Sequence, residues 1–188
     1  MPATNKENVC PAWREELLSL AVVYGDSLSL EWASQVCHRA VYAANLDTIQ
    51  FTCWQSQALA NPSLRRRAVQ SASLADMIVV ALKEHGEVPP ELRVWTEEWL
   101  PQRRQNWGAL VALVGHPEPT PPAPSPIAAY LRTIAARANL DYFTQELQYP
   151  QEPNLYYRAM IAERVLNLTS SFRSSLDRTG SRHQPTAA

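Results

Sequence analysis

Short apolar runs alternate with amphipathic segments along this chain, and this alternation limits the possible folds more than any other feature of the sequence. Five runs rich in aliphatic, β-branched and aromatic residues are predicted to be strands: 17–25, 48–54, 76–82, 109–115 and 140–145. The segments between and after them repeat apolar residues every three or four positions, which predicts helices over 29–45, 61–75, 88–104, 127–139 and 152–176. Strands that alternate with helices pair in parallel, with helices covering the sheet.

This order of elements predicts an α/β fold with a single doubly wound sheet of five parallel strands. Right-handed crossovers leave few topologies for such a chain, and the expected strand order is 2-1-3-4-5, with helices on both faces. We expect one domain over 17–176, after a polar lead-in over 1–16 and before a disordered tail over 177–188. Six prolines between 117 and 126 exclude a helix or a central strand there, so 116–126 is predicted to be an extended connection.

The charge and cysteine content exclude several classes of protein. The net charge of −1 gives no reason to expect nucleic acid or an anionic membrane surface as a partner, and no apolar run reaches the roughly 18 residues of a membrane span. The three cysteines (Cys10, Cys37 and Cys53) are odd in number and lack CxxC spacing, which predicts reduced thiols in a cytoplasmic protein without a structural zinc site. Cys37 on a helix stripe and Cys53 in a strand are predicted to be inert core thiols.

The chain has 6 tryptophans, and their positions predict two different environments. Trp95 and Trp99 lie four residues apart on one helix face with Leu92, so we expect both in the core. Three others fall near element ends, where one or two could line a surface patch: Trp32, Trp54 and Trp107.

The loops that follow the first and third predicted strands carry the candidate binding residues. In an open parallel sheet, ligands bind at the carboxyl ends of the strands where the order reverses, and here this crevice lies between loops 24–30 and 83–89. In the first loop, Ser27 and Ser29 could hold a phosphate together with the amide groups of the next helix. Asp26 would place a negative charge beside that phosphate. The other interpretation is a helix N-cap made by one of these three side chains, and the sequence leaves both open.

The second loop, KEHGE, carries the greatest concentration of reactive groups in the chain. Four of its side chains could supply a general base or a weak metal site: Lys83, Glu84, His85 and Glu87. The alternative is a solvated loop in which Gly86 makes the turn. His116 follows the neighbouring strand, but two histidines without a carboxylate cluster do not predict a metal site. The motifs G-x-G-x-x-G, G-x-x-x-x-G-K-[ST] and G-x-S-x-G are absent, so nucleotide binding and a serine nucleophile have no motif support.

The predicted layout, together with the stretch ADMIVVALKEHGEVPPELRVWTEEWL, resembles the flavodoxin-like superfold, which also includes response-regulator receivers and small bacterial proteins of that fold. The resemblance to flavodoxins implies bound FMN, with its phosphate near Ser27 and Ser29 and its isoalloxazine near Glu84 and His85. A flavodoxin phosphate loop is rich in serine, threonine and glycine. Here Gly25 comes early and no glycine follows it in the loop.

The resemblance to receivers implies an aspartate at the end of the third strand that accepts the phosphoryl group, and a lysine after the fifth. Here the third strand ends Ala81-Leu82-Lys83 and the fifth ends Thr144-Gln145-Glu146, so both residues are missing. The first functional hypothesis is therefore a non-catalytic, receiver-like binding or regulatory module that acts through protein contacts and holds no cofactor.

The alternative hypothesis is an FMN-binding flavodoxin, or a relative of the NAD(P)H-flavin reductases, with a degenerate phosphate loop. Hydrolase or transferase chemistry at Glu84 and His85 is a third. We expect a protein partner, and the helix 152–176 offers apolar residues for core or homodimer packing: Leu155, Met160, Ile161, Val165 and Leu168. The arginine run 65–67 is interpreted as a solvated helix face, and the alternative is that it contacts a partner.

Overall fold

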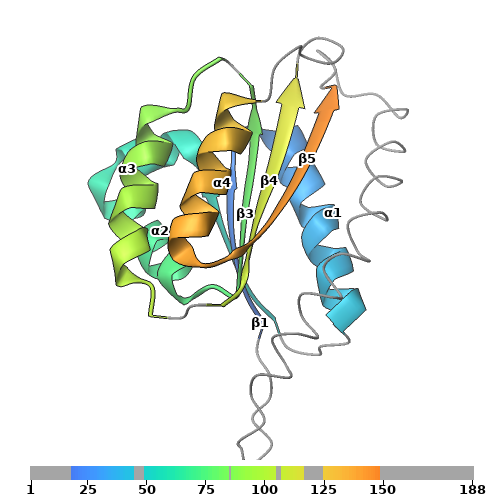
Figure 1. Ribbon diagram of the computed structural model, residues 1–188, viewed down its shortest axis with the longest axis horizontal. Helices are drawn as coiled ribbons and strands as arrows, with labels where there is room; N and C mark the ends of the chain where they lie inside the picture. Colours follow the sequence, from blue (N-terminus) through green and yellow to red (C-terminus); the bar gives the residue numbers. More distant parts are fainter. Residues whose placement is uncertain (1–17, 45–48, 85, 105–106, 117–124, 149–188) are drawn as a thin grey trace, which may run out of the picture.

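A computed structural model describes residues 18–44, 49–84, 86–104, 107–116 and 125–148 of the chain. Its strands are β1 (Leu18–Tyr24), β2 (Ile49–Gln55), β3 (Met77–Lys83), β4 (Ala109–His116) and β5 (Asp141–Gln148). Its α-helices are α1 (Ser27–Ala44), α2 (Pro62–Leu74), α3 (Pro90–Trp99) and α4 (Pro126–Ala138), and two 3₁₀ turns are η1 (Ser56–Ala60) and η2 (Leu100–Gln102). Figure 1 shows these elements as a twisted sheet between helices.

The five strands form one parallel sheet in the order β2-β1-β3-β4-β5, as the sequence predicts. All five predicted strands are present, and their ends differ from the prediction by at most three residues. The predicted helix over 88–104 is shorter, because the α-helical part ends at Trp99 and continues only as η2. Pro101 lacks the amide hydrogen that another α-helical bond would require, which explains this end.

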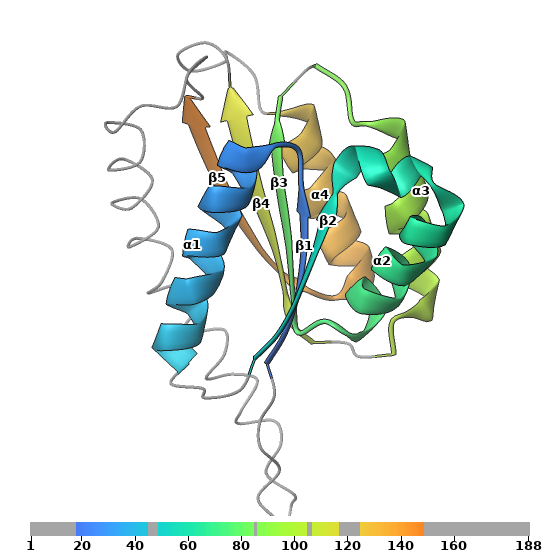
Figure 2. The same cartoon turned by 180° about the vertical axis from the view of Figure 1, so that it is seen from behind.

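Helices cover both faces of the sheet. α1 lies on one face, whereas α2, α3 and α4 lie on the other (Figures 1 and 2). Each face has its own buried cluster: Trp95, Trp99 and their neighbours under α2–α4, and Trp32, Val36 and their neighbours under α1. β3 and β4 are buried along almost their whole length because both of their faces are covered.

The tryptophans follow the prediction, and Trp32 is the one of the three near element ends that is fully buried. Trp95 and Trp99 are buried, with ring centroids 5.9 Å apart. Trp32 has no exposed surface, so it cannot line a surface patch. The reason is the position of α1, which lies over β1, β3 and β4, so that the indole of Trp32 extends toward the edge strand β5. There its N–H donates to Oε1 of Gln145 on β5 at 3.0 Å. Trp54 and Trp107 are only partly buried.

The two described cysteines have opposite environments. Cys37 is buried as predicted, and this burial raises the pKa of its thiol to about 12. The prediction that Cys53 is a core thiol is wrong, because its side chain is exposed. Cys53 belongs to the edge strand β2, and α1 lies over β1, β3 and β4 rather than over it.

A charged pair closes the amino ends of the central strands. Asp76, before β3, accepts the backbone N–H of Ser19 at 2.7 Å. Arg103 donates to three carbonyl oxygens, those of Ala72 at 3.1 Å, Ala75 at 2.9 Å and Trp107 at 2.8 Å. Burial raises the pKa of Asp76 above its ordinary value, while the Ser19 amide and the Arg103 guanidinium act in the opposite direction. This pair ties α2, β1 and the start of β4 together.

Several predictions concern residues outside the described ranges: the lead-in 1–16, the helix 152–176, the tail 177–188 and most of the connection 116–126. The prediction that no helix includes the prolines of that connection is wrong for Pro126, which is the first residue of α4. Proline is accommodated at this position because the first amide of a helix has no partner within the helix.

Candidate functional site

The turn between β1 and α1 is a closed helix cap. Oδ1 of Asp26 accepts the backbone N–H of Ser29 at 2.9 Å. In return, Oγ of Ser29 accepts the backbone N–H of Asp26 at 2.8 Å and that of Gly25 at 3.0 Å. This reciprocal pattern is a capping box, in which each side chain satisfies the amide of the other residue. The N-cap interpretation of the sequence is therefore confirmed, with Asp26 as the cap.

The cap occupies groups that an anion would otherwise use at this helix end. The amides of Gly25, Asp26 and Ser29 are bonded within the turn, and that of Gly25 also donates to the Ala81 carbonyl at 3.0 Å. The Asp26 carboxylate is the negative charge that the α1 dipole favours at its N-terminus. Nζ of Lys83, at the end of β3, lies 3.0 Å from Oδ2 of Asp26 and supplies a counter-charge. Ser29 is buried, whereas Ser27 is exposed.

Replacement of Asp26 by alanine is expected to lower the free energy of unfolding by about 1 kcal/mol, the usual effect of losing an N-cap side chain. Asp26→Ser is the matched control, because serine caps helices well but carries no charge. Urea titrations of both variants measure the difference. If Asp26→Ala unfolds at the wild-type urea concentration, the capping box contributes nothing to stability.

Glu84 connects three segments at the carboxyl edge of the sheet. Its carboxylate accepts the hydroxyl of Ser125 and, through Oε1, the backbone N–H of Gly86 at 3.0 Å. Its own amide donates to the Gly115 carbonyl at 2.8 Å. Ser125 is buried and caps α4, since its Oγ also accepts the amide of Ala128 at 3.2 Å. Glu84 thus lies in the predicted crevice, where its described bonds are all structural.

His116 pairs with a residue that the sequence analysis did not single out. Its Nε2 lies 2.9 Å from Oε2 of Glu146, on the neighbouring strand β5. His116 is only 4% exposed, and Glu146 reaches it from the partly buried edge strand. His85 lies outside the described residues, so its predicted relation to His116 stays a prediction. The signal that could have found Glu146 is the parallel register of β4 and β5. In this register Gln148 lies opposite His116, and Glu146 is two residues before Gln148 on the same strand.

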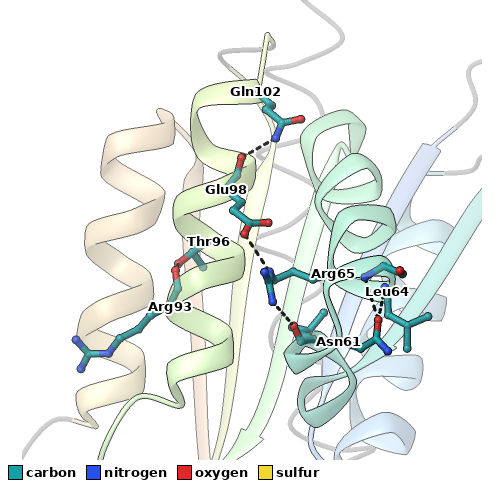
Figure 3. Close-up of polar contacts among 9 residues, drawn as sticks. Asn61, Leu64, Arg65, Arg93, Thr96, Glu98 and Gln102 are labelled. Atoms are coloured by element: carbon teal, nitrogen blue, oxygen red, sulfur yellow. Dashed lines mark hydrogen bonds and ion pairs between the residues drawn. The ribbon is translucent and has the colours of Figure 1, made fainter.

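A second polar region lies between α2 and α3, on the face opposite α1 (Figure 3). Arg65 donates to Oε1 of Glu98 and to the Leu59 carbonyl, both at 3.0 Å. Gln102 donates to the Glu98 carbonyl at 2.9 Å, and Asn61 caps α2. Arg65, Glu98 and Gln102 line an open depression of about 460 Å³, together with Arg66. The interpretation of run 65–67 as solvated is wrong for Arg65, which joins two helices.

The described part of the chain contains neither a candidate metal-binding cluster nor a candidate membrane span. In residues 18–44, 49–84, 86–104, 107–116 and 125–148, no three His, Cys, Asp or Glu side chains are grouped so that they could hold a metal ion. Within the same ranges, no helix combines the length and apolar character needed to cross a membrane.

Comparison with known proteins places the fold but not the activity. No protein family model matches the chain, and no curated protein matches it either. Among solved structures, an NADH:FMN oxidoreductase (EMOB) in its apo form is 16% identical with a TM-score of 0.57, covering 84% of this chain and 89% of that one. A short-chain flavodoxin associated with a non-canonical PDU bacterial microcompartment is 15% identical with a TM-score of 0.52, covering 87% of this chain and 98% of that one.

The metal-soaked Flv1 flavodiiron core from Synechocystis sp. PCC6803 is 10% identical with a TM-score of 0.52. The match covers 84% of this chain but only 36% of the flavodiiron core, so this chain corresponds to about a third of that protein. At these identities the similarity establishes the fold alone. Together with the strand order, it shows that this chain has a flavodoxin-like fold.

Proposed function

We propose that this flavodoxin-like domain is a non-catalytic, receiver-like binding module that acts through contacts with a protein partner. The observation that carries the proposal is the Asp26 carboxylate at the N-terminus of α1, where a bound phosphate would lie in a flavodoxin-like site. Lys83 can balance one negative charge at this helix end, and the Asp26 carboxylate already provides that charge. The carboxylate by itself would repel a further anion about 4 Å away by about 1 to 4 kcal/mol.

The other side chains at this edge support the same proposal. Glu84 holds Ser125 and Gly86, and His116 holds Glu146. A catalytic acid or base needs a hydrogen-bonding position toward its substrate, and these described groups instead bind their neighbours. Lys83 ends β3, the position where a receiver needs an aspartate to accept a phosphoryl group, so the proposed module is not regulated by phosphorylation at this position. The free thiols of Cys37 and Cys53 are compatible with a cytoplasmic protein.

A second candidate function is FMN binding, in the manner of a flavodoxin or of an NAD(P)H-flavin reductase. Two structural neighbours, a flavodoxin and an NADH:FMN oxidoreductase, favour it. Ser27 and Ser29 would then face the phosphate, and Glu84 and His85 the isoalloxazine. For Ser29 this requires opening the capping box, because its hydroxyl accepts the amides of Gly25 and Asp26 and donates to the Asp26 carbonyl.

Flavin retention distinguishes the two functions. We expect purified protein that has been incubated with excess FMN and then desalted to show no visible flavin absorbance, because Asp26 occupies the phosphate position. The control is Asp26→Ser, which keeps a cap and removes the charge. A flavin band in the wild-type protein that disappears in the Ser27→Ala/Ser29→Ala variant would overturn the proposal in favour of the second candidate.

A further inference from the structure

The edge strand β2 lacks the features that normally protect a sheet edge. Exposed edges usually carry charged residues or proline, which prevent another strand from adding to them. The sequence of β2, IQFTCWQ, has neither. The opposite edge strand, β5, carries Asp141 and Glu146. β2 is therefore a seven-residue strand of β-branched, aromatic and neutral polar residues whose outer side pairs with no other described strand.

One face of β2 is exposed and apolar. Ile49, Phe51 and Cys53 lie on the side of α1, because their partners in the parallel register are Leu18, Leu20 and Val22 of the cluster under that helix. Ile49 is 40% exposed and Phe51 43% exposed. These side chains stay accessible because α1 packs over β1, β3 and β4 instead of over the edge (Figure 2).

The other face of β2 is bordered by a cation. Trp54 points to the side of α2, and the guanidinium of Arg67 lies 5.5 Å from its ring centroid. Among the described residues, no carboxylate lies within ion-pair distance of Arg67. Leu74, which is 61% exposed, follows Arg67 by seven residues and hence lies on the same side of α2.

The positions of these two α2 residues along β2 follow from helix geometry. α2 connects two parallel strands and therefore runs antiparallel to both. Seven residues of helix cover roughly 10 Å, which equals about three residues of strand. Since Arg67 lies beside Trp54, this places Leu74 near the level of Phe51.

We propose that this β2 edge surface (Ile49, Phe51, Cys53, Arg67 and Leu74) binds an extended segment of a partner protein, which adds to the sheet as a sixth strand and directs an acidic side chain at Arg67. Backbone hydrogen bonds to a sheet edge supply affinity, while alternate side chains supply specificity. Successive side chains of the added strand point to opposite faces of the sheet. One alternate set would therefore contact Phe51 and Ile49, and the other set would contact the guanidinium of Arg67. The inference rests on the proposed function, since it names the surface through which a protein partner is bound.

Charge favours such a partner over a second copy of this chain. β2 contains no carboxylate, so pairing of two β2 strands would bring none to Arg67 from the strand itself. A partner strand with acidic residues at alternate positions supplies a carboxylate to Arg67 beside the Trp54 ring. Glu98 does not compete for Arg67, because it pairs with Arg65.

The test uses two labelled eight-residue peptides, one alternating valine with glutamate and one alternating valine with lysine, titrated with the full chain by fluorescence anisotropy. We expect the glutamate peptide to bind about tenfold more tightly than the lysine peptide, a difference of about 1.4 kcal/mol, because Arg67 attracts the first peptide and repels the second. Arg67→Glu should abolish or reverse this preference. The matched control is Arg66→Glu, the next residue on α2, which lines the depression toward α3 and should leave the preference unchanged.

Three results would overturn the inference. The first is an equal preference in Arg67→Glu and wild-type protein, and the second is peptide-induced changes in backbone amide NMR signals that lie outside β2 and α2. The third is a concentration-dependent dimer in sedimentation that Phe51→Lys dissociates, because a second copy then occupies the edge. Thermal melts confirm that the variants are folded. Flavin retention, measured separately, would contradict the proposed function without affecting the peptide result, so the two failures are distinguishable.

Discussion

Gly108→Ala is expected to lower the free energy of unfolding by about 3 kcal/mol or more, one of the largest effects of any single substitution in this domain. Gly108 has φ +122°, a backbone conformation that residues with a Cβ rarely adopt. An added Cβ would overlap the carbonyl oxygen of Asp76 and lie 2.8 Å from Nη2 of Arg103. The Asp76 carbonyl cannot move away easily, because it accepts the amide of Ala109 at 2.9 Å at the start of β4.

Gly86→Ala is the matched control for this substitution. Gly86 also has a positive φ, +84°, but an added Cβ would meet nothing within 4 Å. We expect it to cost only about 1 kcal/mol, the conformational part of the effect. Chemical denaturation of both variants measures the difference. Equal losses of stability in the two variants would show that close packing at Gly108 is unimportant.

Arg103→Met should lower the free energy of unfolding at pH 7 by about 3 kcal/mol, because it removes the donor to three carbonyl groups and the cation next to a partly buried carboxylate. Arg104→Met is the control: this neighbouring residue is exposed, and its replacement should change stability by less than about 0.5 kcal/mol. Urea titrations of the two variants and the wild type provide the comparison.

The loss in Arg103→Met should also depend on pH, with a predictable sign. Burial already raises the pKa of Asp76 above its ordinary value of 3.8, and Arg103 opposes that rise. Without Arg103 the pKa of Asp76 in the folded state rises further, so the folded variant binds a proton at a pH where the unfolded chain has released it. Stability of the variant relative to wild type should therefore improve as the pH falls from 7 toward 4. A loss of the same size at both pH values would indicate that only the carbonyl hydrogen bonds matter.

Much of the fold follows from local sequence patterns. The strand order could be predicted because five apolar runs alternate with helical segments and parallel crossovers are right-handed. Asparagine followed by proline is typical of a helix start, and α2 begins at such a pair: Asn61 accepts the amides of Ser63 at 2.9 Å and Leu64 at 3.4 Å, and Pro62 is the first helical residue. Such signals depend on neighbours in the sequence, and for this reason they are readable without a structure.

The candidate site was only partly predictable. The sequence predicts either phosphate ligands at Ser27 and Ser29 or an N-cap made by Asp26, Ser27 or Ser29. The choice between these depends on the Ser29 hydroxyl, which bonds within its own turn. The partners Lys83 of Asp26, Ser125 of Glu84 and Glu146 of His116 are 57, 41 and 30 residues away in the chain. No local pattern gives such pairs, because they arise where the carboxyl ends of different strands meet.

By itself, the sequence determined the class of fold, the order of the strands and the burial of Trp95 and Trp99, since hydrophobic periodicity is written into each segment separately. Only the tertiary structure decided that Trp32 is buried and Cys53 exposed. Both outcomes result from the position of α1, which packs over β1, β3 and β4 and leaves the edge strand uncovered. The position of a helix across a sheet depends on how whole faces pack together, and this physical quantity belongs to the assembled layers rather than to any one segment.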